Sequence, residues 1–143
     1  MTGQGRVRSI QIRVRYAETD QMGIAHHSHY LVWCEEARTT FMRESGVSYR
    51  DLEAQGLLLA VVEASVRYRA SARYDDVLRA DCWVRESNRR RVVFGYAFYR
   101  EGEERLLATA QTSLMPLDSR HALGSVPSDV LSHLEPAVDP VRL

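Results

Sequence analysis

The sequence predicts an α+β domain in which an antiparallel sheet covers one apolar helix. Hydrophobic residues alternate with polar ones in five segments, as in half-buried strands, and recur every three or four residues in another, as in an amphipathic helix. The order is one strand, then the helix, then a meander of strands, which favours an antiparallel sheet. The length of 143 residues predicts a single domain over residues 1–143.

The first strand and the helix form the N-terminal part of this arrangement. The strand is expected over residues 7–16, where isoleucine, valine and tyrosine alternate with polar residues. A polar connection over residues 20–28 leads into a helix of about four turns. Its apolar stripe includes Trp33 and Phe41, and Gly46 is expected to cap its C-terminus. Each large apolar side chain buried under the sheet contributes about 1.5–3 kcal/mol.

Four further strands are expected after the helix, because hydrophobic and polar residues alternate in each of four later segments. Tyr68 and Tyr96 are interpreted as packing on the sheet face. Residues 128–134 are expected to form a short helix before a frayed end. The four strands are expected over residues 57–70, 77–86, 91–100 and 106–115.

The composition argues against several classes of protein. The 19 basic and 19 acidic residues give a net charge of zero, so no global field attracts nucleic acid or an anionic membrane. The sequence contains no apolar run of about eighteen residues and no signal-peptide core, which predicts no membrane span and a cytoplasmic location. Cys34 and Cys82 lie in apolar segments and are expected to be buried, reduced thiols.

The segment with the most chemically active side chains is YAETDQMGIAHHSHY, residues 16–30, between the first strand and the helix. Asp20 has no basic residue close to it in the sequence, which suits a carboxylate that faces a cleft. A turn-forming or helix-starting role is the alternative for Asp20. Gly23 would allow the connecting turn a conformation or a close approach that a Cβ would block.

The histidines of this segment suggest a metal site, because imidazole and carboxylate groups are common ligands of zinc and iron. On a helix, however, ligand histidines stand three or four residues apart on one face. His26, His27 and His29 would point in different directions, and only His26 and His29 could share a face. No metal is therefore expected.

The stretch RVRYAETDQMGIAHHSHYLVWCEEAR resembles the hotdog-fold acyl-CoA thioesterases of the 4-hydroxybenzoyl-CoA thioesterase group. Residues 68–76, 89–103 and 106–118 also resemble later strands of this family. The resemblance implies a five-stranded antiparallel sheet wrapped around a long central helix, in homodimers joined edge to edge and often in homotetramers. The shared residues are Tyr16, Thr19, Asp20, Gly23, His27, Tyr30, Glu36 and Arg38.

The resemblance also implies roles for individual residues. Asp20 would be the catalytic carboxylate, and His27 would open the helix with its backbone N–H directed at the thioester carbonyl. Tyr16 would pack beside Asp20. The reaction would be hydrolysis of an acyl-CoA, or of an acyl-carrier protein thioester, at a site between subunits without metal or bound cofactor.

The sequence departs from the family pattern at three positions. His26 stands where the family usually has an aromatic residue, commonly tyrosine, and His29 where asparagine is common. Leu114 follows Thr112 and Ser113 where many relatives have a histidine. The roles of His26 and His29 are left open by the sequence.

Thioester hydrolysis needs a base or nucleophile, donors for the oxyanion and a grip on the acyl carrier. Asp20 could supply the first, either by activating water or by attacking the thioester itself. The helix start could supply the second, since its free N–H groups and positive dipole end favour developing negative charge. Cys34 is the weaker nucleophile, because no positive group precedes Arg38 to lower its pKa.

Candidate substrate-binding residues lie on the helix and in a later turn. Arg89, Arg90 and Arg91 form the densest cationic run and could contact the phosphates of CoA, although a solvated turn is the alternative. Tyr30 and Glu36 are placed at the substrate by the family pattern. A solvated position or a contact between subunits is the alternative for Glu36.

Three functions are compatible with these features. Hydrolysis of an acyl-CoA thioester is the main prediction. A hotdog hydratase or dehydratase would use the same scaffold with a histidine and a carboxylate, and the Asp20 to Gly23 turn fits a thioesterase better. A non-catalytic module that binds acyl thioesters is the third hypothesis, because a fold does not determine a function.

Overall fold

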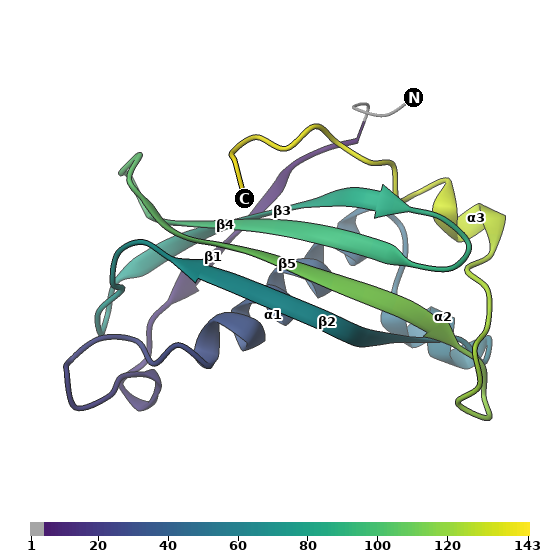
Figure 1. Cartoon of the computed structure of the whole chain (residues 1–143), viewed down its shortest axis with the longest axis horizontal. Helices are drawn as coiled ribbons and strands as arrows, with labels where there is room; N and C mark the ends of the chain where they lie inside the picture. Colours follow the sequence, from purple (N-terminus) through teal and green to yellow (C-terminus); the bar gives the residue numbers. More distant parts are fainter. Residues whose placement is uncertain (1–4) are drawn as a thin grey trace.

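The computed structural model describes residues 5–143, in which a five-stranded antiparallel sheet wraps around one long helix (Figure 1). The spatial order of the strands is β1-β3-β4-β5-β2, and the predicted α+β fold class is confirmed. The strands are β1 (Arg8–Arg13), β2 (Leu58–Tyr68), β3 (Val77–Ser87), β4 (Val92–Arg100) and β5 (Leu106–Leu117). The helices are α1 (His29–Glu44), α2 (Tyr49–Ala54) and α3 (Ser128–Leu131), with a 3-10 turn, η1 (Tyr16–Glu18).

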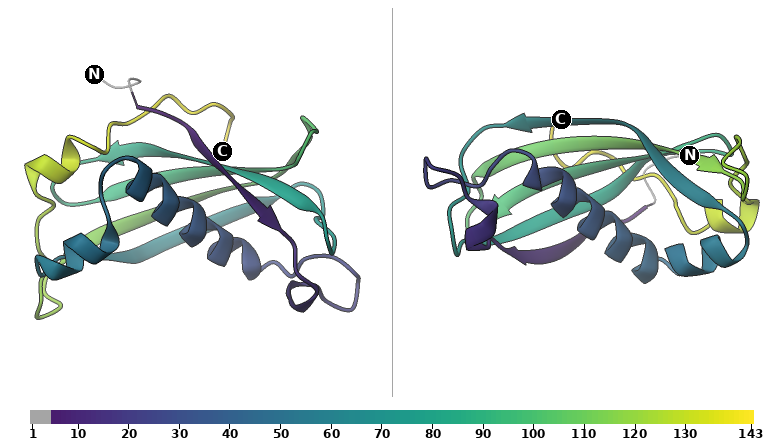
Figure 2. Two further views of the ribbon diagram at one scale, coloured as in Figure 1. Left: turned by 180° about the vertical axis from the view of Figure 1, so that it is seen from behind. Right: turned by 90° about the horizontal axis from the view of Figure 1, so that it is seen from below.

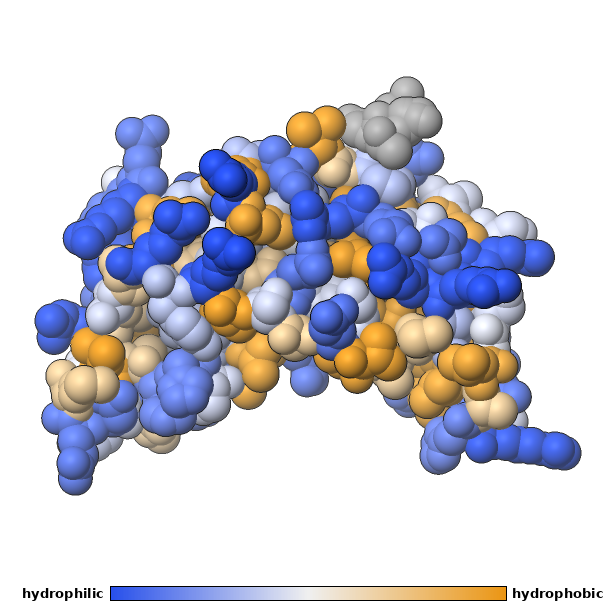
Figure 3. All heavy atoms as spheres, viewed as in Figure 1, coloured by the Kyte–Doolittle hydropathy of each residue, from blue (hydrophilic) through white to orange (hydrophobic). Residues whose placement is uncertain are grey.

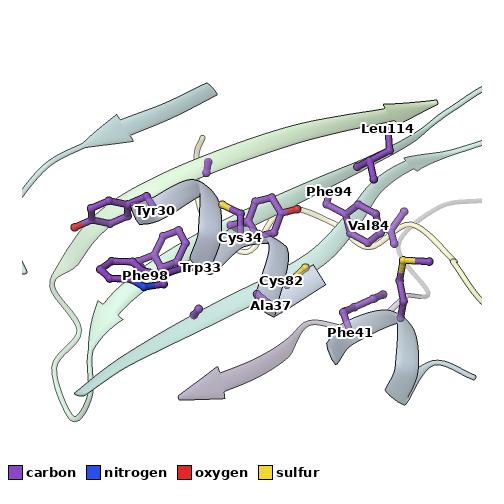
Figure 4. Packing of buried hydrophobic residues seen from close by; sticks show 14 of the residues in the cluster. Tyr30, Trp33, Cys34, Ala37, Phe41, Cys82, Val84, Phe94, Phe98 and Leu114 are labelled. Carbon is purple, nitrogen blue, oxygen red and sulfur yellow. The ribbon is translucent and has the colours of Figure 1, made fainter. Parts of the chain in front are cut away.

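Helix α1 lies along the concave face of the sheet and forms the centre of the core (Figure 2). The predicted stripe is buried, and alternate residues of β3 and β4 pack against it (Figure 4). The ring of Phe41 packs edge-on against that of Phe94, with centroids 5.9 Å apart. Cys34 and Cys82 are buried free thiols, and burial raises the pKa of Cys34 to about 12, so neither suits nucleophilic chemistry.

Two local elements differ from the sequence prediction. Strand β1 ends at Arg13, three residues early, because the chain bends into η1, where Arg15 and Glu18 hydrogen-bond to each other. Helix α2 was not predicted. Its six residues are too few to show helical periodicity, and only the N-cap of Ser48, whose hydroxyl accepts the Asp51 N–H, marks its start.

The C-terminal strap, residues 135–143, crosses the outer face of the sheet (Figure 1, yellow). The Ala137 N–H donates to the Val84 carbonyl at 2.9 Å. The Asp139 carboxylate accepts from the Trp83 indole at 2.8 Å and pairs with Arg85 at 2.7 Å. The expectation of a frayed end is therefore wrong, and Trp83, which alternates along β3 with the residues that face α1, is fully buried under the strap.

Because Gly95 has no side chain, the Trp83 ring can lie directly against its Cα on the outer face of the sheet. A Cβ at Gly95 would lie 2.6 Å from Cε2 of Trp83. Gly95→Ala should therefore lower the free energy of unfolding by about 1–3 kcal/mol, as overpacking does, in urea titrations. The same substitution in a Trp83→Leu background should have a smaller effect. An equal loss in both backgrounds would contradict this packing argument.

Within residues 5–143, no helix has both the length and the apolar character needed to cross a lipid bilayer.

Candidate active site

The site loop, residues 19–27, joins η1 to α1 and presents Asp20. Thr19 and Ala25 form an antiparallel bridge, and the Asp20 N–H donates to the Ile24 carbonyl at 2.9 Å. The Gly23 N–H donates to the Asp20 carbonyl at 3.0 Å and closes a tight turn. Gly23 has a φ of 77°, a left-handed conformation that favours glycine. The turn thus fixes the backbone on both sides of Asp20.

The Asp20 carboxylate has one oxygen held by the loop. Its Oδ1 accepts the Met22 N–H at 2.8 Å, and Oδ2 has no hydrogen-bond partner among residues 5–143. Asp20, His27 and Arg69 line the same cavity of about 370 Å³. Its remaining lining comes from the site loop, the first turn of α1 and the segment after β2, namely Met22, Ile24, Ala25, Tyr30, Tyr68, Ala70 and Ser71.

The helix start supplies an unpaired backbone donor in a residue that lines the same cavity as Asp20. Helix α1 begins at His29, so the expectation that His27 opens the helix is corrected by two residues. The N–H groups of His26, Ser28 and His29 are bonded to the Glu18 carbonyl, to His26 Nδ1 and to the His26 carbonyl, respectively. Within the described part of the chain, the His27 N–H has no partner. It lies where the positive end of the α1 dipole favours an anion.

Two tyrosines hold the helix start against the sheet. The Tyr68 hydroxyl donates to the His27 carbonyl at 3.0 Å. Tyr30 is buried and packs edge-on against Tyr68 and Phe98, with centroids 5.2 and 5.4 Å apart. Tyr68 was interpreted from the sequence as simple sheet packing. No sequence signal links residues 27 and 68, because the contact depends on where β2 ends relative to α1.

The three histidines lie in different environments around the helix start. His26 Nδ1 lies 2.9 Å from the Ser28 hydroxyl and also accepts the Ser28 N–H, so His26 satisfies polar groups at the start of α1. The His27 ring stacks obliquely on His26, and the His29 ring stands edge-on to His26. Among the described residues, no group of three or more histidine, cysteine or acidic side chains is arranged to hold a metal ion.

Tyr16 and Glu36 lie outside the cavity of the protomer. Tyr16 is largely exposed, packs edge-on against Tyr74 with ring centroids 5.6 Å apart, and is not among the residues that line the cavity with Asp20. Glu36 lies on the exposed side of α1. The structure of one protomer therefore brings together Asp20, His27 and Tyr30 from the predicted set.

The arginine run lies in the turn between β3 and β4, at the far end of the sheet. Strand β3 starts next to the site loop and has eleven residues, which span about 36 Å at about 3.3 Å per residue. Arg91 is paired with Glu86 at 3.0 Å. Within one protomer, the arginine that lines the cavity is Arg69, which the sequence did not single out.

An antiparallel sheet of five strands wrapped around a long helix defines the hotdog class of proteins. The family model of the Thioesterase-like superfamily matches residues 14–134, which includes the site loop and the whole sheet except β1. The chain belongs to this superfamily.

Proteins that are similar in sequence and solved structures that are similar in fold agree with this assignment. The putative acyl-CoA thioesterase YneP of Bacillus subtilis is 37% identical over 119 residues, which cover 78% of this chain and 86% of YneP. The DHNA-CoA thioesterase of Staphylococcus aureus is 32% identical, with a TM-score of 0.79 over 86% of this chain and 81% of that chain. The hypothetical protein TT1821 of Thermus thermophilus is 37% identical, with a TM-score of 0.83 over 88% of this chain and 95% of that chain.

Proposed function

We propose that this chain is an acyl-CoA thioesterase, which hydrolyses an acyl-CoA to the free acid and CoA. The observation that carries the proposal is that Asp20, which has an unpaired carboxylate oxygen, and His27, which has an unpaired backbone N–H, line one cavity. The larger cavity of about 590 Å³, under the C-terminal strap, offers no such combination at a helix start. The names of the relatives from Bacillus subtilis and Staphylococcus aureus support the same chemistry.

The His27 N–H would stabilise the oxyanion. With the thioester carbonyl oxygen at this N–H, the charge that develops during attack meets a fixed donor and the positive end of α1. The donor needs no reorganisation, because the Tyr68 hydroxyl and the His26 carbonyl hold the backbone on either side. One such donor contributes about 2.7–4 kcal/mol in other hydrolases.

Asp20 would act in one of two ways. As a general base, Asp20 takes a proton from water while the water oxygen attacks the carbonyl carbon. The tetrahedral intermediate then expels CoA as a thiolate, which receives that proton. As a nucleophile, Asp20 attacks the carbonyl carbon, CoA leaves as the thiolate, and water hydrolyses the resulting mixed anhydride.

Measuring turnover of acyl thioesters distinguishes the proposed thioesterase activity from the two alternative functions, a hydratase and a non-catalytic binding module. Purified protein should release free thiol from aromatic, short-chain or long-chain acyl-CoAs or from acyl-carrier protein thioesters, and EDTA should not reduce the rate. Addition of water to an enoyl-CoA without thiol release would instead indicate a hydratase. Binding of acyl-CoA without turnover of any thioester would indicate a non-catalytic module.

As part of this proposal, the active form is a dimer in which a second copy of the chain covers the edge of β2. This strand has eleven residues, and its outer edge is unpaired within residues 5–143, whereas a long, exposed strand edge is normally covered. Val61 and Val62 on β2 and Leu31 and Val32 on α1 are exposed, and hydrophobic atoms gather on the lower rim near β2 (Figure 3). The cavity lies at the Tyr68 end of β2, so a second copy there would help to enclose the substrate.

Arg69 should contact the phosphates of CoA at the cavity. Arg69→Ala should raise KM for acyl-CoA about tenfold, since a charge-assisted hydrogen bond contributes about 1.5 kcal/mol, and should leave KM for an acyl-pantetheine nearly unchanged. Arg67→Ala is the matched control, because Arg67 lines the outer-face cavity. An equal rise for both substrates would contradict the phosphate contact.

The run at residues 89–91 stays a separate candidate for phosphate binding, since a partner subunit could bring it to the cavity. Replacement of all three arginines by alanine should also raise KM selectively for acyl-CoA. If the KM of this triple variant for acyl-CoA equals that of the wild type, the run at residues 89–91 is a solvated turn that does not contact the phosphates.

A further inference from the structure

Glu18 is a buried carboxylate that the proposed chemistry does not use. Its side chain is 3% exposed. Oε1 accepts the Arg15 N–H at 2.8 Å, and Oε2 accepts the Trp33 indole N–H at 3.0 Å and a guanidinium N–H of Arg15 at 3.2 Å. One carboxylate therefore joins the segment that follows β1 to helix α1.

The backbone of Glu18 extends this link into the site loop. Its carbonyl accepts the His26 N–H at 2.8 Å. Asp20 follows Glu18 by two residues, and His27 follows His26 directly. Both proposed functional groups are therefore one or two residues away from a hydrogen bond made by Glu18.

The ionised form of Glu18 is the one that makes these contacts. Burial acts to raise the pKa of the carboxyl group, but the hydrogen bonds from Arg15 and Trp33 outweigh burial and lower the pKa. A buried charge with partners seldom stabilises a protein more than an apolar residue of similar size does. The arrangement is better explained by the geometry that it imposes on the loop.

We infer that Glu18 is a positioning residue, which holds Asp20 and the His27 N–H in register across the cavity by fastening the site loop to Trp33 of α1. The inference rests on the proposed thioesterase function. Displacements of about 1 Å in an active site can reduce the rate about a hundredfold, so this link would affect turnover without touching the substrate.

Three variants test the link. Glu18→Gln replaces one acceptor oxygen by an amide NH₂, which donates and cannot accept, so either the Arg15 backbone N–H or the Trp33 indole N–H loses its acceptor. Trp33→Phe removes only the indole N–H and part of the ring. Trp83→Phe is the matched control, because its indole N–H also donates to a carboxylate, that of Asp139, but on the outer face of the sheet.

The first readout is steady-state kinetics with acyl-CoA. Glu18→Gln and Trp33→Phe should each lower kcat about ten- to a hundredfold and change KM by less than about threefold, while Trp83→Phe stays near wild type. Wild-type kcat in both site variants, or the same loss in Trp83→Phe, would overturn the inference.

The second readout does not depend on activity. Amide hydrogen exchange of residues 19–27 should become faster in Glu18→Gln and Trp33→Phe but not in Trp83→Phe, with the sheet unchanged. Unchanged exchange at the His26 amide would overturn the link even if kcat falls. A wild-type protein without thioesterase activity would instead refute the proposed function, and exchange would still decide whether Glu18 holds the loop.

Discussion

Replacement of Asp20 by asparagine should lower kcat for acyl-CoA hydrolysis by about 10²- to 10⁴-fold, the range expected when a general base is lost. The asparagine side chain keeps an oxygen that can accept the Met22 N–H, so the turn at Gly23 should persist. Near-ultraviolet circular dichroism and the assembly mass should match those of the wild type. The substitution thus removes the charge of residue 20 and leaves the shape of the loop.

The alternative role of Asp20 as a turn-former makes the opposite prediction. If the side chain only supports the loop, Asp20→Asn should hydrolyse thioesters at the wild-type rate and Asp20→Ala should be impaired. Single-turnover hydrolysis in ¹⁸O-labelled water then separates the two chemical routes. Label in the Asp20 carboxylate would exclude a simple general-base route, and label only in the product acid would favour it.

Glutamates at both Val61 and Val62 should dissociate the proposed dimer and abolish most of its hydrolysis. An interface with two-fold symmetry contains each substitution twice, so four like charges would meet at the β2 edges. Burying or crowding unpaired charges in an interface costs several kcal/mol. Light scattering should show a dimer or tetramer of the 16.4 kDa chain for the wild type and a smaller species for the variant.

The control places the same two charges on exposed apolar residues elsewhere. Leu123 and Val138 are both more exposed than Val61 and Val62 and lie outside β2. Leu123→Glu with Val138→Glu should leave mass and activity unchanged. A wild type that is monomeric and fully active would refute the dimer proposal, as would a Val61 and Val62 variant that keeps its wild-type mass.

Most of the fold could be predicted from local patterns. The alternation in β3, with Leu78 and Val84 facing α1, and the stripe of Trp33 and Phe41 were each visible in the sequence, because burial of one face imposes a fixed period on hydrophobic residues. The short helix α2 could not be predicted in this way, since six residues cover fewer than two helical periods. The burial of Trp83 also depends on a strap more than fifty residues later in the chain.

The candidate site, too, could be predicted from the sequence only where its residues are neighbours along the chain. The segment from Asp20 to His27 was identified because its residues are close in sequence and match a family pattern. The two contacts that hold it, from Glu18 to Trp33 and from Tyr68 to His27, join different elements and had no sequence signal. Arg69 likewise reaches the cavity only because β2 ends beside the start of α1.

The sequence by itself determined the class of fold, the position of the site loop and the residues able to carry the chemistry, because these depend on periodicity and on neighbours along the chain. Only the tertiary structure decided which of those residues meet. The structure left Tyr16 and Glu36 outside the cavity of the protomer and added Tyr68 and Arg69. The physical reason is that such contacts depend on strand register and on how the sheet packs on α1, which no single segment encodes.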